Sequence, residues 1–498
     1  FQRGFWVDIE DDDLGPLRLP GPPYRHAEGG WHLRRRPPAL GEHDDEVGSP
    51  EGVARTRPAP SGRTRSDQPP LRGVRVLDLT TVWSGPFVTL LLADLGAEVV
   101  RVENPSVFPP TTKGYVPRPD SSMLLGSLLS SYGPLAEGRP DRPFNRHALN
   151  NSIARNKLSC TLDPRRPEAR ELLLRLVDTA DVFVENLKAS TLHQMGIHES
   201  ELLDRNPRLI VLRIPPAGLT GDWSAYTGFG AQFDGLSGLA HLTGHAGSSP
   251  IETPATTYMD AATGPAGAFA VMAALHYRDV TGRGQVVELA QMENVLNQLG
   301  DVFVDCQLGI EPVRIGNRVA DRAPQGMYRC RDPKQWLAVS VGDDQAWAAL
   351  AGVLGPPELA ADPRFADLAG RSAHHDDIDE LIGAWTAEHD MLEAFHLLQA
   401  AGVAAGPELD NDLLLEDANV AVRSWIRPLT STDVGRHLHL GHAFRGLPLV
   451  WDRGAPGLGE DNRYVFGKIL GLDPPVYDGL VAAGVIVEDY LDAEGRPA

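Results

Sequence analysis

Cysteine is scarce in this chain of 498 residues, which contains only Cys160, Cys306 and Cys330. None of the three lies in a CxxC pair, so neither a disulfide framework nor a zinc site of the usual spacing is expected. The acidic cluster Asp8–Asp13 and the HHDD motif at His374–Asp377 also lack the convergent spacing of metal ligands. We therefore expect no metal, and three free thiols in a reducing, cytoplasmic compartment.

Long apolar runs and an excess of positive charge are also missing. No run approaches the roughly 20 apolar residues that a membrane-spanning helix needs. The 67 acidic residues outnumber the 46 basic ones, which gives a net charge of -21 and argues against a nucleic-acid surface. A polyanionic ligand would have to be bound by a local basic patch. We expect no membrane partner and no nucleic-acid partner.

Strand and helix patterns alternate in the first half of the chain. The stretch Val74–Leu79 reads as a strand, Phe87–Leu95 as an amphipathic helix and Ala97–Glu103 as a second strand, which together form one βαβ unit. Later stretches continue the alternation, with strands at Val182–Glu185 and Leu209–Arg213 and helices at Pro167–Asp178 and Glu199–Arg205. The pattern predicts an α/β large domain at 71–290 with a parallel, Rossmann-like sheet. Its first turn, TTVWSGPF, lacks the G-x-G-x-x-G of dinucleotide-binding folds, so a dehydrogenase is disfavoured.

The second half predicts a smaller α/β domain at 291–424. It contains one strand-like stretch and three helical stretches: Trp336–Val341, Asp343–Leu354, Asp376–Glu388 and Met391–Ala401. Residues 425–498 form a last segment, and β-like alternation returns in its first part, Trp425–Val465.

The N-terminal residues differ from the rest. GPLRLPGPPYR (Gly15–Arg25) and PALGEHDDEV (Pro38–Val47) resemble the later GRHLHLGHAFR (Gly435–Arg445) and PGLGEDNRYV (Pro456–Val465). Such a repeat supports the hypothesis that residues 1–50 are the tail of a preceding unit in a tandem protein, with 51–70 as a Pro/Arg/Ser linker. The alternative is that two Pro/Gly-rich segments are alike by composition.

Asp260 is the strongest candidate for chemistry. It follows a strand-like stretch, Pro254–Met259, and precedes a long apolar helical run, Ala261–Leu275, that TGRGQ (Thr281–Gln285) closes. A carboxylate in a first helical turn is stabilised by unpaired N–H groups and by the helix dipole. Two interpretations follow: Asp260 caps the helix, or it is a nucleophile.

Four groups of residues occur in an order that resembles a known family. They are LRGVRVLDLTTVWSGPFVTLLLADLGAEVVRVENP from Leu71, ARNKLSCTLD from Ala154, ADVFVENLKASTLHQMGI from Ala180, and YMDAATG with TGRGQ. From about Leu71 to its end the chain resembles the class III coenzyme A transferases, the CaiB/BaiF-like family. The resemblance implies that the C-terminal segment returns to the large domain. It also implies an interlocked homodimer, or a pseudo-dimer with a tandem first unit.

The resemblance further implies that Asp260 attacks an acyl-CoA donor and that CoA passes through an aspartyl-CoA thioester to a free carboxylic acid. Coenzyme A enters as the acyl-CoA substrate. The residues implied to bind it are Val82, Trp83, Ser84, Arg101, Asn104, Lys157, Asn186, Leu187 and Met195. Two positions depart from the family pattern: Gln194 stands where Arg is common, and Trp83 replaces a polar side chain of some members.

Two other functions stay open at this point. An acyl-CoA racemase on the same fold needs a His base opposite Asp260, but Phe229 occupies its place, and His241 and His245 follow at different spacing. A non-catalytic scaffold half of a tandem enzyme is the other alternative, and the intact YMDAATG motif argues against it.

Overall fold

The computed structural model describes residues 3–27, 30–45, 67–114, 116–119, 142–252, 257–442 and 444–498. Most of the expected linker at 51–70 lies outside these ranges. The chain divides into two compact units, one with residues 1–239, 255–311 and 427–498 and the other with 240–254 and 312–426. In the described part, no helix is long and apolar enough to cross a membrane.

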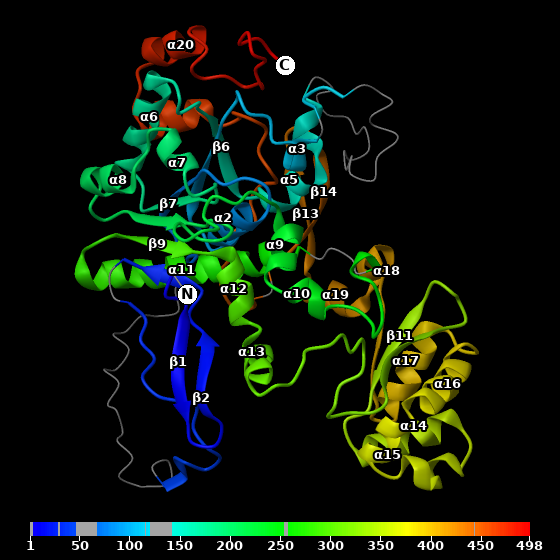
Figure 1. Ribbon diagram of the computed structural model, residues 1–498. Coiled ribbons are helices and arrows are strands. Elements are labelled where there is room, and N and C mark those ends of the chain that lie inside the picture. Colours follow the sequence, from blue (N-terminus) through cyan, green and yellow to red (C-terminus); the bar gives the residue numbers. More distant parts are fainter. Residues whose placement is uncertain are drawn as a thin grey trace. The chain divides into compact units, whose positions relative to one another are not determined.

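A seven-stranded sheet forms the centre of the first unit (Figure 1). Its strands, in spatial order, are β3 (Tyr24–His26), β9 (Gln285–Leu289), β8 (Ile210–Arg213), β7 (Val182–Glu185), β4 (Arg75–Asp78), β5 (Glu98–Glu103) and β6 (Lys157–Thr161). All neighbours are parallel except β3, which pairs antiparallel with β9. The strand order reverses between β4 and β7, as in doubly wound nucleotide-binding folds. The predicted α/β class with a parallel, Rossmann-like sheet is confirmed.

Helices cover both faces of this sheet, so its strands are apolar on both sides. One face packs against α6 (Pro167–Val177), α8 (Glu199–Arg205) and residues near the C-terminus such as Phe466 and Ile486. The other face packs against α2 (Ser84–Asp94) and α11 (Tyr258–Thr281).

Helices α2 and α11 lie unusually close together. A methyl group on Gly264 would lie 2.1 Å from Phe87, and one on Gly267 would lie 2.5 Å from Val88. Glycine at these two positions lets the α11 backbone approach α2. The first turns of both helices are thereby brought to one place.

The remaining elements of the first unit are short. Its helices are α3 (Pro110–Lys113), α5 (Ala148–Ile153), α7 (Thr191–Gln194), α9 (Gly230–Leu236), α12 (Gln291–Asn297), α13 (Gly300–Gln307) and α20 (Pro474–Ala482), with a 3-10 turn at Pro143–Arg146 and a π-helical turn at Arg463–Ile469. Two hairpins lie outside the sheet: β1 (Trp6–Asp11) with β2 (Gly15–Pro20), and β13 (Ile426–Ser431) with β14 (Gly435–Leu440).

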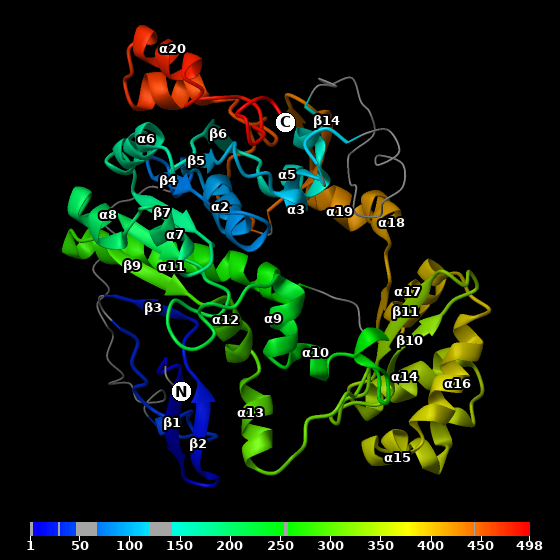
Figure 2. The ribbon, with the colours of Figure 1, turned by 45° about the horizontal axis from the view of Figure 1, so that its top comes forward.

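C-terminal residues join the first unit along its edge strand β6. The Asn462 side chain accepts from the Thr161 N–H at 3.0 Å, and the Asp461 side chain accepts from the Ser159 N–H at 2.9 Å. Figure 2 shows this C-terminal part, in orange and red, beside β5 and β6. Residues 427–498 therefore belong with the large sheet.

The second unit has its own core around an antiparallel sheet of β10 (Gln325–Arg329), β11 (Trp336–Ser340) and β12 (Ala404–Pro407). Its predicted helices are confirmed as α14 (Asp344–Leu354), α16 (His375–Thr386) and α17 (Met391–Ala400). Shorter helices are α10 (Leu239–Leu242), at the boundary of the units, α15 (Leu368–Ala373), α18 (Asn411–Glu416) and α19 (Ala418–Arg423), with 3-10 turns at Pro250–Glu252, Leu359–Ala361 and Pro363–Phe365.

One expected element differs near the candidate nucleophile. The stretch Pro254–Met259 was expected to be a strand. Its last two residues are helical instead, because α11 begins at Tyr258. Pro254–Thr256 lie outside the described residues. Asp260 is thus the third residue of α11, with its side chain at the helix start.

Candidate active site

The Asp260 carboxylate lies where the N-termini of α2 and α11 meet. It is buried, with 8% of its surface exposed. It accepts hydrogen bonds from both the hydroxyl and the backbone N–H of Ser84, the first residue of α2. The Ser84 N–H group and the positive dipole ends of two helices offset part of the cost of burying a carboxylate at this place.

The capping role at α11 belongs to another carboxylate. Asp234 on α9 accepts from the N–H of Tyr258 at 3.0 Å and from the N–H of Met259 at 3.1 Å. Thr257, the residue before the helix, has a left-handed backbone with φ 46°. Asp234 therefore fixes the start of α11, and the Asp260 carboxylate does not cap its own helix.

Gly230 provides the space for this carboxylate. A methyl group on Gly230 would lie 2.2 Å from Oδ2 of Asp260 and 3.3 Å from the Thr257 side chain. Any side chain at this position would displace the carboxylate or the helix start.

The surroundings of Asp260 change its acidity. Burial raises the pKa of Asp260, and the nearby charge of Asp234 raises it further, while the two hydrogen bonds from Ser84 lower it; the net effect is a raised pKa. A carboxylate with a raised pKa is a stronger base and a better nucleophile than a solvated one, once it is ionised.

The loop before α2 is held in place by Asn186. Its side chain accepts from the Thr81 N–H at 2.8 Å and donates to the Thr81 carbonyl at 2.8 Å and to the Ser84 hydroxyl oxygen at 3.2 Å. Between these contacts Val82 has a φ of 64°, a value that β-branched residues rarely adopt. Asn186 therefore orients Ser84, and Ser84 orients Asp260.

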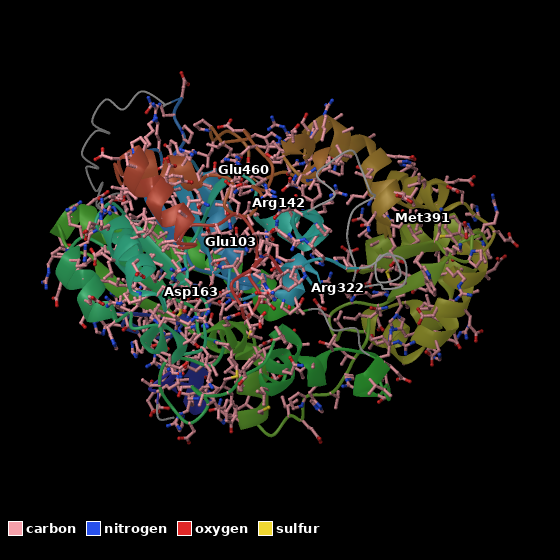
Figure 3. The ribbon with its side chains drawn as sticks, turned by 90° about the horizontal axis from the view of Figure 1, so that it is seen from above. Glu103, Arg142, Asp163, Arg322, Met391 and Glu460 are labelled. Carbon is pink, nitrogen blue, oxygen red and sulfur yellow. The ribbon has the colours of Figure 1, made fainter. Side chains whose placement is uncertain are left out.

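A cavity of about 330 Å³ opens at the carboxyl ends of the central parallel strands. It lies at the point where the strand order reverses, the usual ligand site of open α/β sheets. Glu103 and Asp163 mark this edge of the sheet in Figure 3. The cavity is lined by Leu79, Thr80, Thr81, Arg101, Val102, Glu103, Asn104, Val107, Pro109, Leu162, Pro164, Arg165, Leu187, Thr191, Gln194, Met195 and Tyr490.

Four of the nine expected coenzyme-binding residues line this cavity, namely Arg101, Asn104, Leu187 and Met195. The others lie elsewhere. Ser84 and Asn186 hold the loop and Asp260, and Val82 and Trp83 belong to the same loop.

Lys157 is not among the residues that line the cavity. Its ammonium is fully buried and donates to Asp78 at 3.1 Å, to the Pro86 carbonyl at 2.9 Å and to the Thr89 hydroxyl at 2.7 Å. Burial lowers the pKa of Lys157 to about 8, against the opposing effect of Asp78. These contacts join β6 to the start of α2, and the expected contact of Lys157 with coenzyme A stays a prediction.

Sequence reasoning missed three residues of the site. Gly230 and Asp234 follow Phe229 in the sequence, and only the fold brings them close to the start of α11. Tyr490 reaches the cavity from the C-terminal segment, where it packs edge-on against Phe108 and Phe144. No local pattern marks it.

The place where a racemase would carry its second base holds a phenylalanine. Phe229, at the place of the expected histidine, is 60% exposed at the start of α9. His241 and His245 belong to the second compact unit, whereas Asp260 belongs to the first.

Comparisons with known proteins identify the family of this chain. The model of CoA-transferase family III matches residues 71–462, so the chain belongs to this family of enzymes. It is 32% identical to the succinyl-CoA–D-citramalate CoA-transferase of Chloroflexus aurantiacus, over 81% of this chain and 94% of that protein. It is 30% identical to a probable CoA-transferase of Mycobacterium tuberculosis, over 93% of this chain but only 56% of that longer protein. The crystal structure of a CaiB/BaiF family protein from Brucella suis superposes with a TM-score of 0.70 at 28% identity, covering 81% of this chain and all of that one.

Replacing Gly230 by alanine should displace the Asp260 carboxylate. A misplacement of about 1 Å can lower kcat on the order of 100-fold, and we expect a loss of that size in steady-state assays of CoA transfer. Gly235→Ala on the same helix is the matched control, because nothing lies within 4 Å of its added methyl group. Equal activity of the two variants would contradict the geometry described here.

Asp260→Asn should stabilise the protein at neutral pH. Because the pKa of Asp260 is raised in the folded state, the folded state resists ionisation, and stability falls as the pH rises through that pKa. Asparagine removes this effect, so the gain in Tm should vanish well below the unfolded pKa of about 4 and should grow as the pH rises through the raised pKa of Asp260. Thermal denaturation at several pH values measures it, with Asp279→Asn at the exposed end of α11 as the control. A Tm difference that is independent of pH would refute this account.

Proposed function

We propose that this chain moves coenzyme A from an acyl-CoA donor to a free carboxylic acid, with Asp260 as the covalent carrier. The observation that supports it is the buried Asp260 carboxylate with its raised pKa, bound by Ser84 between two helix N-termini. The same N–H groups would stabilise the negative charge that develops on an oxygen of the reacting carbonyl.

The reaction proceeds through two anhydrides. An Asp260 oxygen attacks the thioester carbonyl carbon, the C–S bond breaks, and CoA thiolate leaves an acyl-aspartyl anhydride. The thiolate attacks the aspartyl carbonyl, which releases the donor carboxylate and forms the aspartyl-CoA thioester. The acceptor carboxylate then displaces CoA thiolate to give a second anhydride. Attack of the thiolate on the acceptor carbonyl yields the new acyl-CoA and regenerates the Asp260 carboxylate.

We place the nucleotide part of CoA in the cavity at the strand ends. Arg101 and Arg165 supply positive charge there, and Leu187 and Met195 supply an apolar surface for the adenine. Thr81 lines the cavity, and Ser84, three residues on, contacts Asp260. The loop therefore gives the pantetheine arm a path from the cavity to the nucleophile.

The names of the relatives suggest the substrate class. The transferase of Chloroflexus aurantiacus is named for succinyl-CoA and D-citramalate, and a mouse relative with 28% identity is named for succinyl-CoA and glutarate. We propose that succinyl-CoA or a similar dicarboxylic acyl-CoA is the donor and a dicarboxylic acid the acceptor.

Trapping the intermediate tests the carrier role. Incubation with succinyl-CoA and no acceptor should leave an aspartyl-CoA or acyl adduct on Asp260, which hydroxylamine treatment and peptide mass mapping detect. Asp260→Ala and Asp260→Asn should both lose the adduct and the turnover while still binding CoA in the cavity. Near-normal exchange by Asp260→Asn would overturn the mechanism.

We also propose that the enzyme works as paired units, either an interlocked homodimer or a pseudo-dimer with a tandem first unit. The repeat between the N-terminal and C-terminal segments supports this pairing, as does the relative of which this chain spans 56%. If the unit is a homodimer, light scattering at micromolar concentration should give the mass of two of these 53.9 kDa chains. If it is a tandem pseudo-dimer, a single polypeptide that carries both units should be active as a monomer, whereas this chain alone should not. A monodisperse, active monomer of this chain would contradict the proposal.

A further inference from the structure

The cavity at the strand ends has three buried polar residues in a lining that is otherwise mostly apolar. Arg101 and Glu103 are two residues apart on β5, and Tyr490 comes from the C-terminal segment. Arg101 is 4% exposed, Glu103 7% and Tyr490 1%. We call these three residues the polar triad. Apolar side chains such as Leu187 and Met195 line the same cavity.

Glu103 has one carboxylate oxygen that lacks a hydrogen bond. Its Oε2 accepts from the Ser159 hydroxyl at 2.6 Å, and that hydroxyl in turn accepts from the Gly459 N–H at 3.0 Å. Its Oε1 lies 3.4 Å from the Lys113 ammonium and 3.6 Å from the Arg101 guanidinium, but accepts no hydrogen bond from the described residues. Burial raises the pKa of Glu103, but the charges of Arg101 and Lys113 outweigh it, so the pKa is lowered and the carboxylate is ionised. Oε1 is therefore a buried acceptor that lacks a donor.

Tyr490 and Arg101 are donors that lack an acceptor. The Tyr490 hydroxyl makes no hydrogen bond with the part of the chain that the structure describes. Burial raises the pKa of this hydroxyl well above its usual value and the charge of Glu103 raises it further, so the hydroxyl keeps its proton. Arg101 donates to Asn150 at 3.1 Å, while its Nε is buried without an acceptor among the described residues. The polar triad thus offers one acceptor and two donors.

Tyr490 is fixed in its position beside the cavity. Its ring packs edge-on against Phe108 and Phe144, with centroids 5.0 Å and 5.1 Å apart. The Leu491 N–H donates to the Pro105 carbonyl at 2.9 Å, which ties this segment to the chain just after β5. A donor held in this way loses little freedom when a ligand binds.

The charges around the triad balance one another and leave no spare cation for a phosphate. Three buried cations face three carboxylates: Arg101, Lys113 and Lys157, and Glu103, Asp78 and Asp433. Arg165 also lines the cavity and pairs with Asp163, but 55% of its side chain is exposed. A phosphate therefore favours Arg165, and an uncharged polar group favours the triad.

Adenine has an edge that fits this pattern of donors and acceptors. Its N6 amino group is a donor, and the ring nitrogens N7 and N1 on either side of it are acceptors. The amino group can donate to Oε1 of Glu103 while a ring nitrogen accepts from Tyr490 or Arg101. In hypoxanthine and guanine, O6 replaces the amino group, so two acceptors would face each other without a proton between them.

We propose that the polar triad recognises the adenine edge of coenzyme A, with Glu103 as the acceptor for N6 and Tyr490 as a donor to a ring nitrogen. The base then faces the triad and the phosphates face Arg165. The inference rests on the proposed function, because it takes the nucleotide part of coenzyme A as the occupant of this cavity. It adds two residues that select the base and take no part in the chemistry at Asp260.

ADP and IDP test the recognition of the base, because they carry the same phosphates and differ only in adenine and hypoxanthine. Isothermal titration calorimetry on the full chain should give a Kd for ADP that is lower than the Kd for IDP by a factor on the order of ten or more, because IDP leaves buried polar groups unpaired. Equal Kd values for the two nucleotides, or binding of neither, would overturn the inference.

Tyr490→Phe removes the hydroxyl and keeps the ring between Phe108 and Phe144. We expect it to weaken ADP binding about fivefold, the effect of one hydrogen bond. The KM for acyl-CoA should rise by a similar factor with kcat unchanged, because the contact is the same in the ground state and the transition state. Tyr477→Phe is the matched control, since Tyr477 is also buried but does not line the cavity. An unchanged Kd for ADP in Tyr490→Phe would contradict the role of the hydroxyl.

Glu103→Gln should turn the acceptor into a donor. The Ser159 hydroxyl already accepts from Gly459, so its own proton is available to residue 103 and should bind the amide oxygen. The amide NH2 group then takes the place of Oε1, where it opposes the N6 amino group of adenine and can donate to O6 of hypoxanthine. We expect the order of the two affinities to invert, which a general loss of stability could not produce. If circular dichroism shows this variant unfolded, Tyr490→Phe and the ratio of the two Kd values in the unchanged chain decide.

The two proposals can fail separately. If ADP and IDP bind equally while succinyl-CoA still leaves an adduct on Asp260, the recognition of adenine by the triad is wrong and the proposed function stands. If no adduct forms and CoA does not bind, both are wrong. Tighter binding of ADP that Glu103→Gln inverts supports the role of the triad, whichever acyl group the enzyme transfers.

Discussion

The contact between Ser84 and Asp260 is the interaction on which the site depends. It joins the first turn of α2 to the first turn of α11, two helices that are far apart in sequence. Gly264 and Gly267 make the contact possible, because any larger residue would push the helices apart. The positive ends of two helices offset part of the cost of burying an anion here, but burial and the charge of Asp234 outweigh them, and the pKa of Asp260 is raised.

A buried ionic network around Asp78 supports the loop that carries Ser84. Asp78, at the end of β4, accepts from the Thr80 N–H at 2.9 Å, from the Thr89 hydroxyl at 2.6 Å and from Lys157 at 3.1 Å. Burial raises the pKa of Asp78, but the charges of Lys157 and Arg101 outweigh it and the pKa is lowered. Removing one partner would leave an uncompensated charge inside the protein, a loss of about 3–5 kcal/mol. The loop that carries Ser84 is thus fixed to the sheet by charge, and to β7 by Asn186.

Much of the fold could be predicted from the sequence, because strands buried on both faces form continuous apolar runs. Val182–Glu185 was predicted with the observed bounds, and Glu199–Arg205 likewise. Strands β6 and β9 were not predicted as strands, since Lys157–Thr161 mixes buried polar side chains with apolar ones. Asp260 was identified from its helix-start position and from the family motif. The spacing of residues along the sequence could not show that Asp234 caps α11, because Asp234 lies on another helix, α9.

Lys157 illustrates the limit of residue types as evidence for a ligand site. A lysine beside a strand-end turn suggests phosphate binding, whereas the structure shows the Lys157 ammonium buried with three acceptors beneath α2.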